Sequence, residues 1–73
     1  MAIYEIRFSM NGQIHQCIGS SSYPTKENYN SGNYFEDILQ KNIGQFITLY
    51  KRQYGFNENS PHHLENCTLY FEE

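Results

Sequence analysis

The sequence predicts an α+β fold in the order β-β-α-β, in which a three-stranded, mostly antiparallel sheet carries one long helix on one face. Three observations predict it. Two segments near the start alternate apolar and polar residues, a middle segment repeats apolar residues every three or four positions, and a last segment alternates again. The 73 residues make one domain, residues 1–73.

The first two strands are expected at residues 3–9 and 13–19, joined through the Asn11-Gly12 pair as a hairpin. A two-residue turn at Asn11-Gly12 leaves Ile14 and Ile18 on the polar face. A three-residue turn that includes Met10 instead pairs Phe8 with Ile14 and Tyr4 with Ile18. Because burial of apolar residues fixes strand register, we expect the three-residue turn.

This register turns His15 and Cys17 away from the core, whereas Cys67 lies on the core side of the last strand, with Leu69 and Phe71. A disulfide requires Cα atoms within about 7 Å and converging side chains. The sequence therefore predicts that the two cysteines do not bond to each other.

The helix is expected at residues 34–54. Asn33 and Glu36 have the spacing of a capping box, and Gly55 suits the left-handed position after the last turn. Gly44 lies in mid-helix, where the helix either continues at a cost of about 1 kcal/mol or breaks. The apolar stripe consists of Phe35, Ile38, Leu39, Ile43, Phe46, Leu49 and Tyr50.

The third strand is expected at residues 67–72, after a polar connector that contains Pro61. We favour the strand order 2-1-3, because the first strand has the cleanest alternation. The alternative places the third strand parallel to the second, through a right-handed crossover.

Composition excludes several classes of function. A net charge of −3 with no basic cluster argues against direct nucleic-acid binding. The sequence shows no signal-peptide pattern and no apolar run of about 18 residues, so we expect a cytoplasmic protein with reduced cysteines and no membrane span. No catalytic or cofactor motif stands out, so we expect neither enzyme activity nor a cofactor.

The loop at residues 19–33 is the most informative segment. It holds no Val, Ile, Leu or Met, yet tyrosines recur in and beside it among Ser, Asn and Gly, a composition typical of antibody paratopes. A solvated linker whose rings lie over the sheet edge is the alternative. The predicted binding surface consists of Tyr23, Glu27, Asn28, Tyr29, Asn30 and Tyr34, together with Arg52 and Tyr54 at the helix end.

The sequence therefore favours a small, acidic, non-catalytic module that binds a larger protein. One hypothesis is an inhibitor of the kind that phages and mobile elements carry, such as an anti-CRISPR protein, which blocks the functional surface of a nucleic-acid-processing enzyme. Two alternatives remain open. One is a zinc protein that uses His15 and Cys17 with His62 and His63, although the spacing matches no common structural zinc motif. The other is a regulatory homodimer that pairs exposed edge strands.

Overall fold

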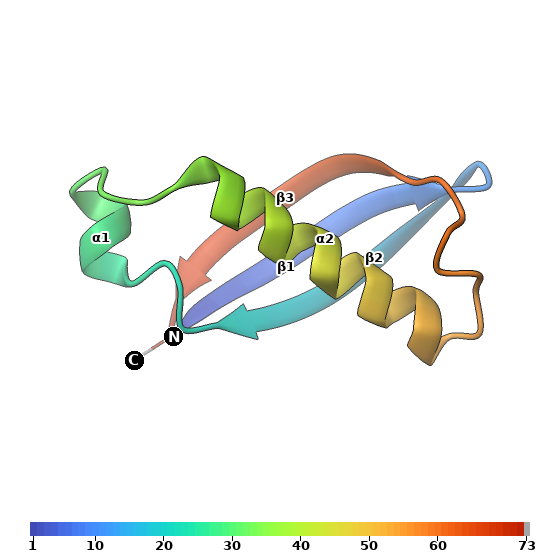
Figure 1. Cartoon of the computed structure of the whole chain (residues 1–73), viewed down its shortest axis with the longest axis horizontal. Coiled ribbons are helices and arrows are strands. Elements are labelled where there is room, and N and C mark those ends of the chain that lie inside the picture. Colours follow the sequence, from blue (N-terminus) through green and yellow to red (C-terminus); the bar gives the residue numbers. More distant parts are fainter. Residues whose placement is uncertain (73) are drawn as a thin grey trace.

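A computed structural model describes residues 1–72. Along the chain it contains β1 (Ala2–Met10), β2 (Gln13–Ser21), α1 (Lys26–Asn30), α2 (Glu36–Gln53) and β3 (His63–Phe71). The sheet order is β2-β1-β3, and both neighbours of β1 run antiparallel to it (Figure 1). The predicted fold class and strand order are confirmed, and α2 runs through Gly44 without a break.

The predicted hairpin register is wrong. Met10 pairs directly with Gln13, so the turn has two residues, and Phe8 lies opposite His15 rather than Ile14. Asn11 and Gly12 both have positive φ, at 54° and 76°, as a type I′ turn requires. The twist of this turn matches the twist of the two strands, and it places Ile14 and Ile18 on the uncovered face of the sheet.

The inner face of β2 carries small or polar residues because α2 brings large rings against it. The Phe46 ring lies directly on Gly19, where an added Cβ would come within 2.5 Å of the ring. Farther along β2, His15 and the Tyr50 hydroxyl share a hydrogen bond of 3.3 Å. The sequence pattern predicted that Ile14 and Ile18 fill the space between β2 and the helix. In the structure, Phe46 and Tyr50 of α2 fill this space.

The core lies between β1 and α2. The buried side chains of β1 that face the helix are those of Ala2, Tyr4, Ile6, Phe8 and Met10. They pack against a ridge on α2 with a spacing of four residues, formed by Leu39, Ile43 and Ile47. The predicted helical stripe was too broad, since Phe35, Ile38 and Leu49 are exposed.

The start of α2 also differs from the prediction. The helix begins at Glu36 and Phe35 is its N-cap residue, without a side-chain hydrogen bond, so the capping box at Asn33 is wrong. The acidic residues Glu36 and Asp37 do occupy the first turn, where their negative charges interact favourably with the positive end of the helix dipole.

The end of α2 follows the prediction closely. The N–H of Phe56 donates to the Lys51 carbonyl at 2.8 Å, and the N–H of Gly55 donates to the Arg52 carbonyl at 3.3 Å. With Gly55 at a φ of +79°, these two bonds form a Schellman motif.

The segment at 19–33 is more ordered in secondary structure than predicted. β2 continues to Ser21, and α1 occupies residues 26–30, with Thr25 as its N-cap. The Thr25 side chain accepts a hydrogen bond of 3.1 Å from the N–H of Asn28. β3 likewise begins at His63, four residues before the predicted start.

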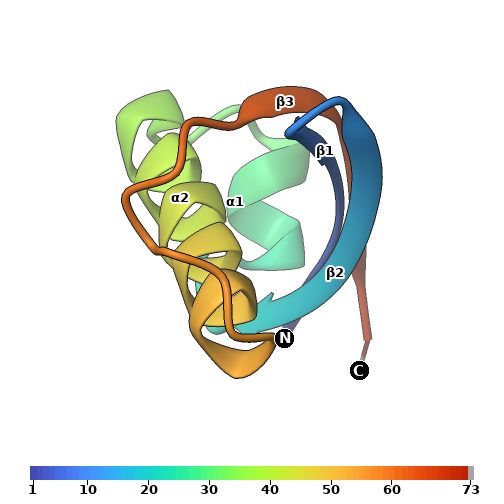
Figure 2. The same cartoon turned by 90° about the vertical axis from the view of Figure 1, so that its right-hand side faces the viewer.

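Both helices lie on the same side of the sheet (Figure 2). Neither helix covers the opposite face, from which Ile14, Ile18 and Tyr70 project, although Ile3 on that face is buried. The last turns of α2 extend beyond β2 at the edge of the sheet (Figure 1). This overhang follows from length, because an 18-residue helix spans about 27 Å and crosses only three strands at an angle.

Candidate interaction surface

The connection between α1 and α2 carries a stack of aromatic rings. The Tyr29 ring lies 4.8 Å from that of Tyr34, nearly parallel to it, and 5.7 Å from that of Phe71. Tyr34 and Phe71 are half-buried against the core, and Tyr29 keeps 37% of its surface exposed. The stack therefore anchors α1 to the sheet while one ring face remains accessible.

Tyr23 serves the fold. Its hydroxyl accepts a hydrogen bond from the backbone N–H of Phe35, and its carbonyl accepts one of 2.7 Å from the Tyr4 hydroxyl. The Asn42 side chain donates to the same Tyr4 oxygen at 3.2 Å. Burial raises the pKa of Tyr4, so this hydroxyl remains a donor at all physiological pH values. Tyr23 thus joins β1, the loop and the start of α2.

Three polar residues of the predicted surface lie on α1. Glu27 and Asn30 are exposed, and Asn28 is half-buried beside the helix cap. Together with Tyr23, Tyr29 and Tyr34, they place six of the eight predicted residues at one end of the molecule.

Sequence reasoning missed two residues of this end. Phe35 and Ile38 are 64% and 38% exposed, although both were assigned to the core stripe. A signal for Phe35 was present, since the acidic pair Glu36-Asp37 belongs in a first helical turn and therefore leaves Phe35 outside the helix. We call the side chains of Tyr29, Tyr34, Phe35 and Ile38 the aromatic end.

Arg52 and Tyr54 lie at the other end of α2, which is about 27 Å long. Arg52 forms an ion pair with Glu58 of the following connector. Tyr54 is 60% exposed, with its ring 4.5 Å from that of Tyr50. The eight predicted residues therefore form two separate surfaces.

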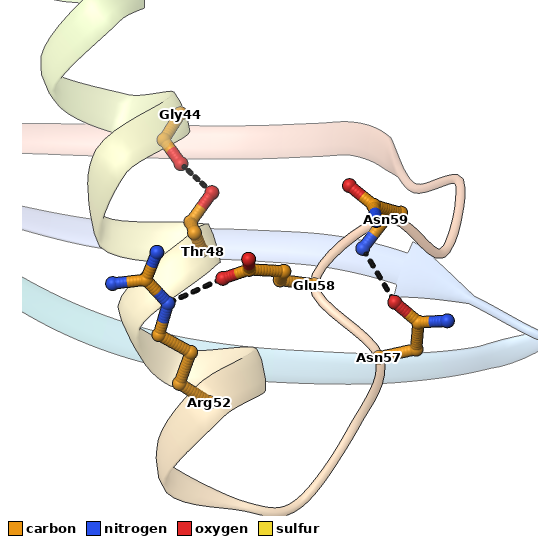
Figure 3. Close-up of polar contacts among 6 residues, drawn as sticks. All are labelled: Gly44, Thr48, Arg52, Asn57, Glu58 and Asn59. Atoms are coloured by element: carbon orange, nitrogen blue, oxygen red, sulfur yellow. Dashed lines mark hydrogen bonds and ion pairs between the residues drawn. The ribbon is translucent and has the colours of Figure 1, made fainter.

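The solvent side of α2 has a shallow hollow beside Gly44 and Thr48. The Thr48 hydroxyl donates to the Gly44 carbonyl at 2.9 Å, and Arg52, which also lines the hollow, pairs with Glu58 (Figure 3). Nearby, the Asn57 side chain accepts a hydrogen bond from the N–H of Asn59. The ion pair between Arg52 and Glu58 holds the connector against the helix.

The histidines have protein partners. Lys51 is 1% exposed, and its Nζ donates to the Ser60 carbonyl at 2.5 Å and to His62 Nδ1 at 2.9 Å. Burial, and then the Lys51 ammonium, lower the pKa of His62, which favours the neutral imidazole that this bond needs. His63 lies on the opposite face of the sheet, across from Ser9.

The cysteines are both free. They lie on the helix side of the sheet, across from Ile6 on either flank, so two strand spacings separate their Cα atoms by about 10 Å. The expected absence of a bond is consistent with this spacing, but the predicted reason, opposite faces, is wrong. Burial raises the pKa of both thiols, most directly by excluding water from the thiolate.

Within residues 1–72, no three His, Cys, Asp or Glu side chains lie close enough together to hold a metal ion. Over the same residues, no helix is long and apolar enough to cross a membrane. Comparison with known proteins gave no match to any family model, curated protein or solved structure. The geometry of the chain itself is therefore the basis for a functional proposal.

Proposed function

We propose that this chain is a small non-catalytic module that binds a larger protein through the aromatic end. The observation that supports it is the exposure of Phe35 and Ile38 beside the Tyr29–Tyr34 stack. Rings held in place by packing lose little entropy on binding, and aromatic residues dominate the binding energy of protein interfaces.

Glu27, Asn28 and Asn30 flank Tyr29 on α1 with polar groups. An apolar centre with a polar rim is the usual anatomy of a protein interface. With a net charge of −3, the module suits a partner whose surface is neutral or basic.

Such a partner is a nucleic-acid-processing enzyme of the cytoplasm, and a bound module of this size would block access to its functional surface. This assigns the chain an inhibitory role of the kind that mobile elements use. The role depends on steric obstruction, because a surface without a run of carboxylates does not imitate a phosphate backbone.

The test begins with affinity capture from the source cell and mass spectrometry, followed by measurement of affinity for the purified partner. Phe35→Ala should weaken binding about 30-fold or more, the effect of losing about 2 kcal/mol at a hot spot. It should leave the melting temperature nearly unchanged, because the ring is mostly exposed.

Ile14→Ala is the matched control, since Ile14 is 50% exposed but projects from the face of the sheet opposite the helices. It should bind like the wild type. Equal affinity of the Phe35→Ala variant and the wild type would refute the aromatic end as the docking surface. Tyr23 is unsuitable for this test, because its hydroxyl stabilises the fold.

A further inference from the structure

β2 presents a free edge that no other part of the described chain pairs with. It lies at the margin of the sheet and pairs only with β1. Its nine residues, QIHQCIGSS, include no charged side chain and no proline. Charges, prolines and bulges are the features that proteins use to prevent pairing at strand edges, and β2 has none of them.

The register identifies the backbone groups at this edge. Hydrogen-bonded pairs alternate along an antiparallel ladder, and the pair next to a two-residue turn is hydrogen-bonded. Counting from the Met10–Gln13 pair, Cys17 and Gly19 direct their backbone groups toward β1. Ile14, Gln16, Ile18 and Ser20 therefore direct their N–H and C=O groups outward.

The other edge of the sheet is protected. β3 carries a bulge opposite the Arg7–Phe8 step, and the extra residue there is the charged Glu65. A bulge interrupts the regular ladder that a further strand would need, and a charge opposes its burial. A further strand would therefore add to the free edge of β2 and not to that of β3.

The last turns of α2 extend over the free edge of β2. A hollow of about 750 Å³ borders β2, and on the outer face of the sheet it extends past Glu5 and Arg7 of β1 to Asn66 and Thr68 of β3. On the helix side its lining is uncharged and consists of Cys17, Phe46, Leu49, Tyr50, Gln53 and Tyr54. Two of these residues, Leu49 and Tyr54, are 55% and 60% exposed.

We propose that an extended, uncharged peptide segment of a partner protein adds to β2 as a fourth strand beneath the last turns of α2. The outward backbone groups of β2 supply the hydrogen bonds, and alternate apolar side chains of the peptide contact Leu49 and Tyr54. The intervening side chains lie beside Ile18, which is 71% exposed on the other face. On the helix side, the uncharged lining matches apolar side chains of the peptide, since a charged side chain would lose water there without a partner; Glu5 and Arg7 border the outer side.

A peptide fits this edge better than a second copy of the chain does. Symmetric pairing of two β2 strands would relate the copies by a two-fold axis at the shared edge. In an antiparallel pairing both α2 helices lie on the same side of the joined sheet, so each copy places an overhanging helix end (Figure 1) over the shared edge, whereas a peptide places none there. This surface is distinct from the aromatic end, so the inference does not depend on the proposed function.

The probe is a phage-displayed library of random peptides about seven residues long, roughly the length of a strand. Selection on the intact chain should enrich peptides with apolar residues at alternate positions. Methylation of a central peptide N–H that bonds to β2 should weaken binding of the synthetic peptide about tenfold, as expected for one lost hydrogen bond. In the complex, the amide protons of Gln16 and Ile18 should exchange with solvent more slowly.

Leu49→Glu should weaken binding of the peptide at least about tenfold, because it puts a charge in the apolar lining. Gln40→Glu puts the same charge on an exposed residue of the same helix outside the hollow and should have no effect. Failure to enrich alternating peptides, equal loss in both variants, or protection of β3 amides instead would each overturn the proposal. A concentration-dependent dimer that the peptide displaces would also overturn it, since a second copy would then be the occupant.

Discussion

The contact between Gly19 and Phe46 provides the sharpest test of the structure. A Cβ added at Gly19 would meet the Phe46 ring at 2.5 Å, whereas carbon atoms in ordinary contact are about 3.5–4.0 Å apart. The nearest atoms include Cγ, the base of the ring, so a turn of the side chain about its end does not relieve the overlap. Gly19→Ala therefore requires the ring, and the helix with it, to move by about 1 Å.

Overpacking of this kind costs about 1–3 kcal/mol. For a domain of this size, each kcal/mol lowers the melting temperature by about 4–8 °C. We expect Gly19→Ala to melt at least about 4 °C below the wild type, measured by circular dichroism or calorimetry. Backbone strain does not contribute, because Gly19 has no left-handed φ.

Gly44→Ala is the matched control. The same chemical change at Gly44 meets no atom within 4 Å, and alanine favours a helix interior over glycine by about 1 kcal/mol. This variant should therefore melt higher than the wild type. The two Gly→Ala variants should thus shift the melting temperature in opposite directions.

A double-mutant cycle assigns the cost of Gly19→Ala to the ring. If the overlap with Phe46 causes the loss, Phe46→Leu should cost less in the Gly19→Ala background than in the wild type, with a coupling of about 1 kcal/mol or more. A Gly19→Ala variant as stable as the wild type would refute the packing. It would also favour the three-residue turn, which places Gly19 on the uncovered face.

Three further predictions concern the buried polar groups and the thiols. Because the fold lowers the pKa of His62 below its usual value near 6.5, the unfolded chain binds more protons around that value. Stability should therefore be highest above pH 6.5 and fall as the pH decreases, and His62→Gln should reduce this slope in melts from pH 8 to pH 5. Lys51→Ala should lower the free energy of unfolding by about 2–3 kcal/mol in urea titrations, because it empties a buried site and leaves the Ser60 carbonyl without its donor; no change would contradict the burial of Lys51. Cys17 and Cys67 should react slowly with a thiol reagent in the folded chain and rapidly in urea, and mild oxidation should yield no intramolecular disulfide, which mass spectrometry would detect.

Local patterns were sufficient for much of the secondary structure. Alternation in β1 predicted the side chains that face the helix, and Gly55 predicted the Schellman end of α2. These features depend on residues within a few positions of one another, so the sequence alone encodes them. The aromatic end was predicted in part for the same reason, because Tyr29 and Tyr34 belong to one segment.

Features that depend on distant segments could not be predicted in this way. The outer position of Ile14 and Ile18 depends on rings that α2 brings to the inner face of β2, and no pattern within the hairpin records them. Burial of Lys51 depends on a carbonyl nine residues away, and exposure of Phe35 depends on where the helix begins relative to the sheet. Sequence by itself determined the number, type and order of the main strands and the long helix, because backbone periodicity is local. Only tertiary structure decided which face of β2 is buried and which edge remains open, because the free energy of burial depends on the surface that packs against each residue.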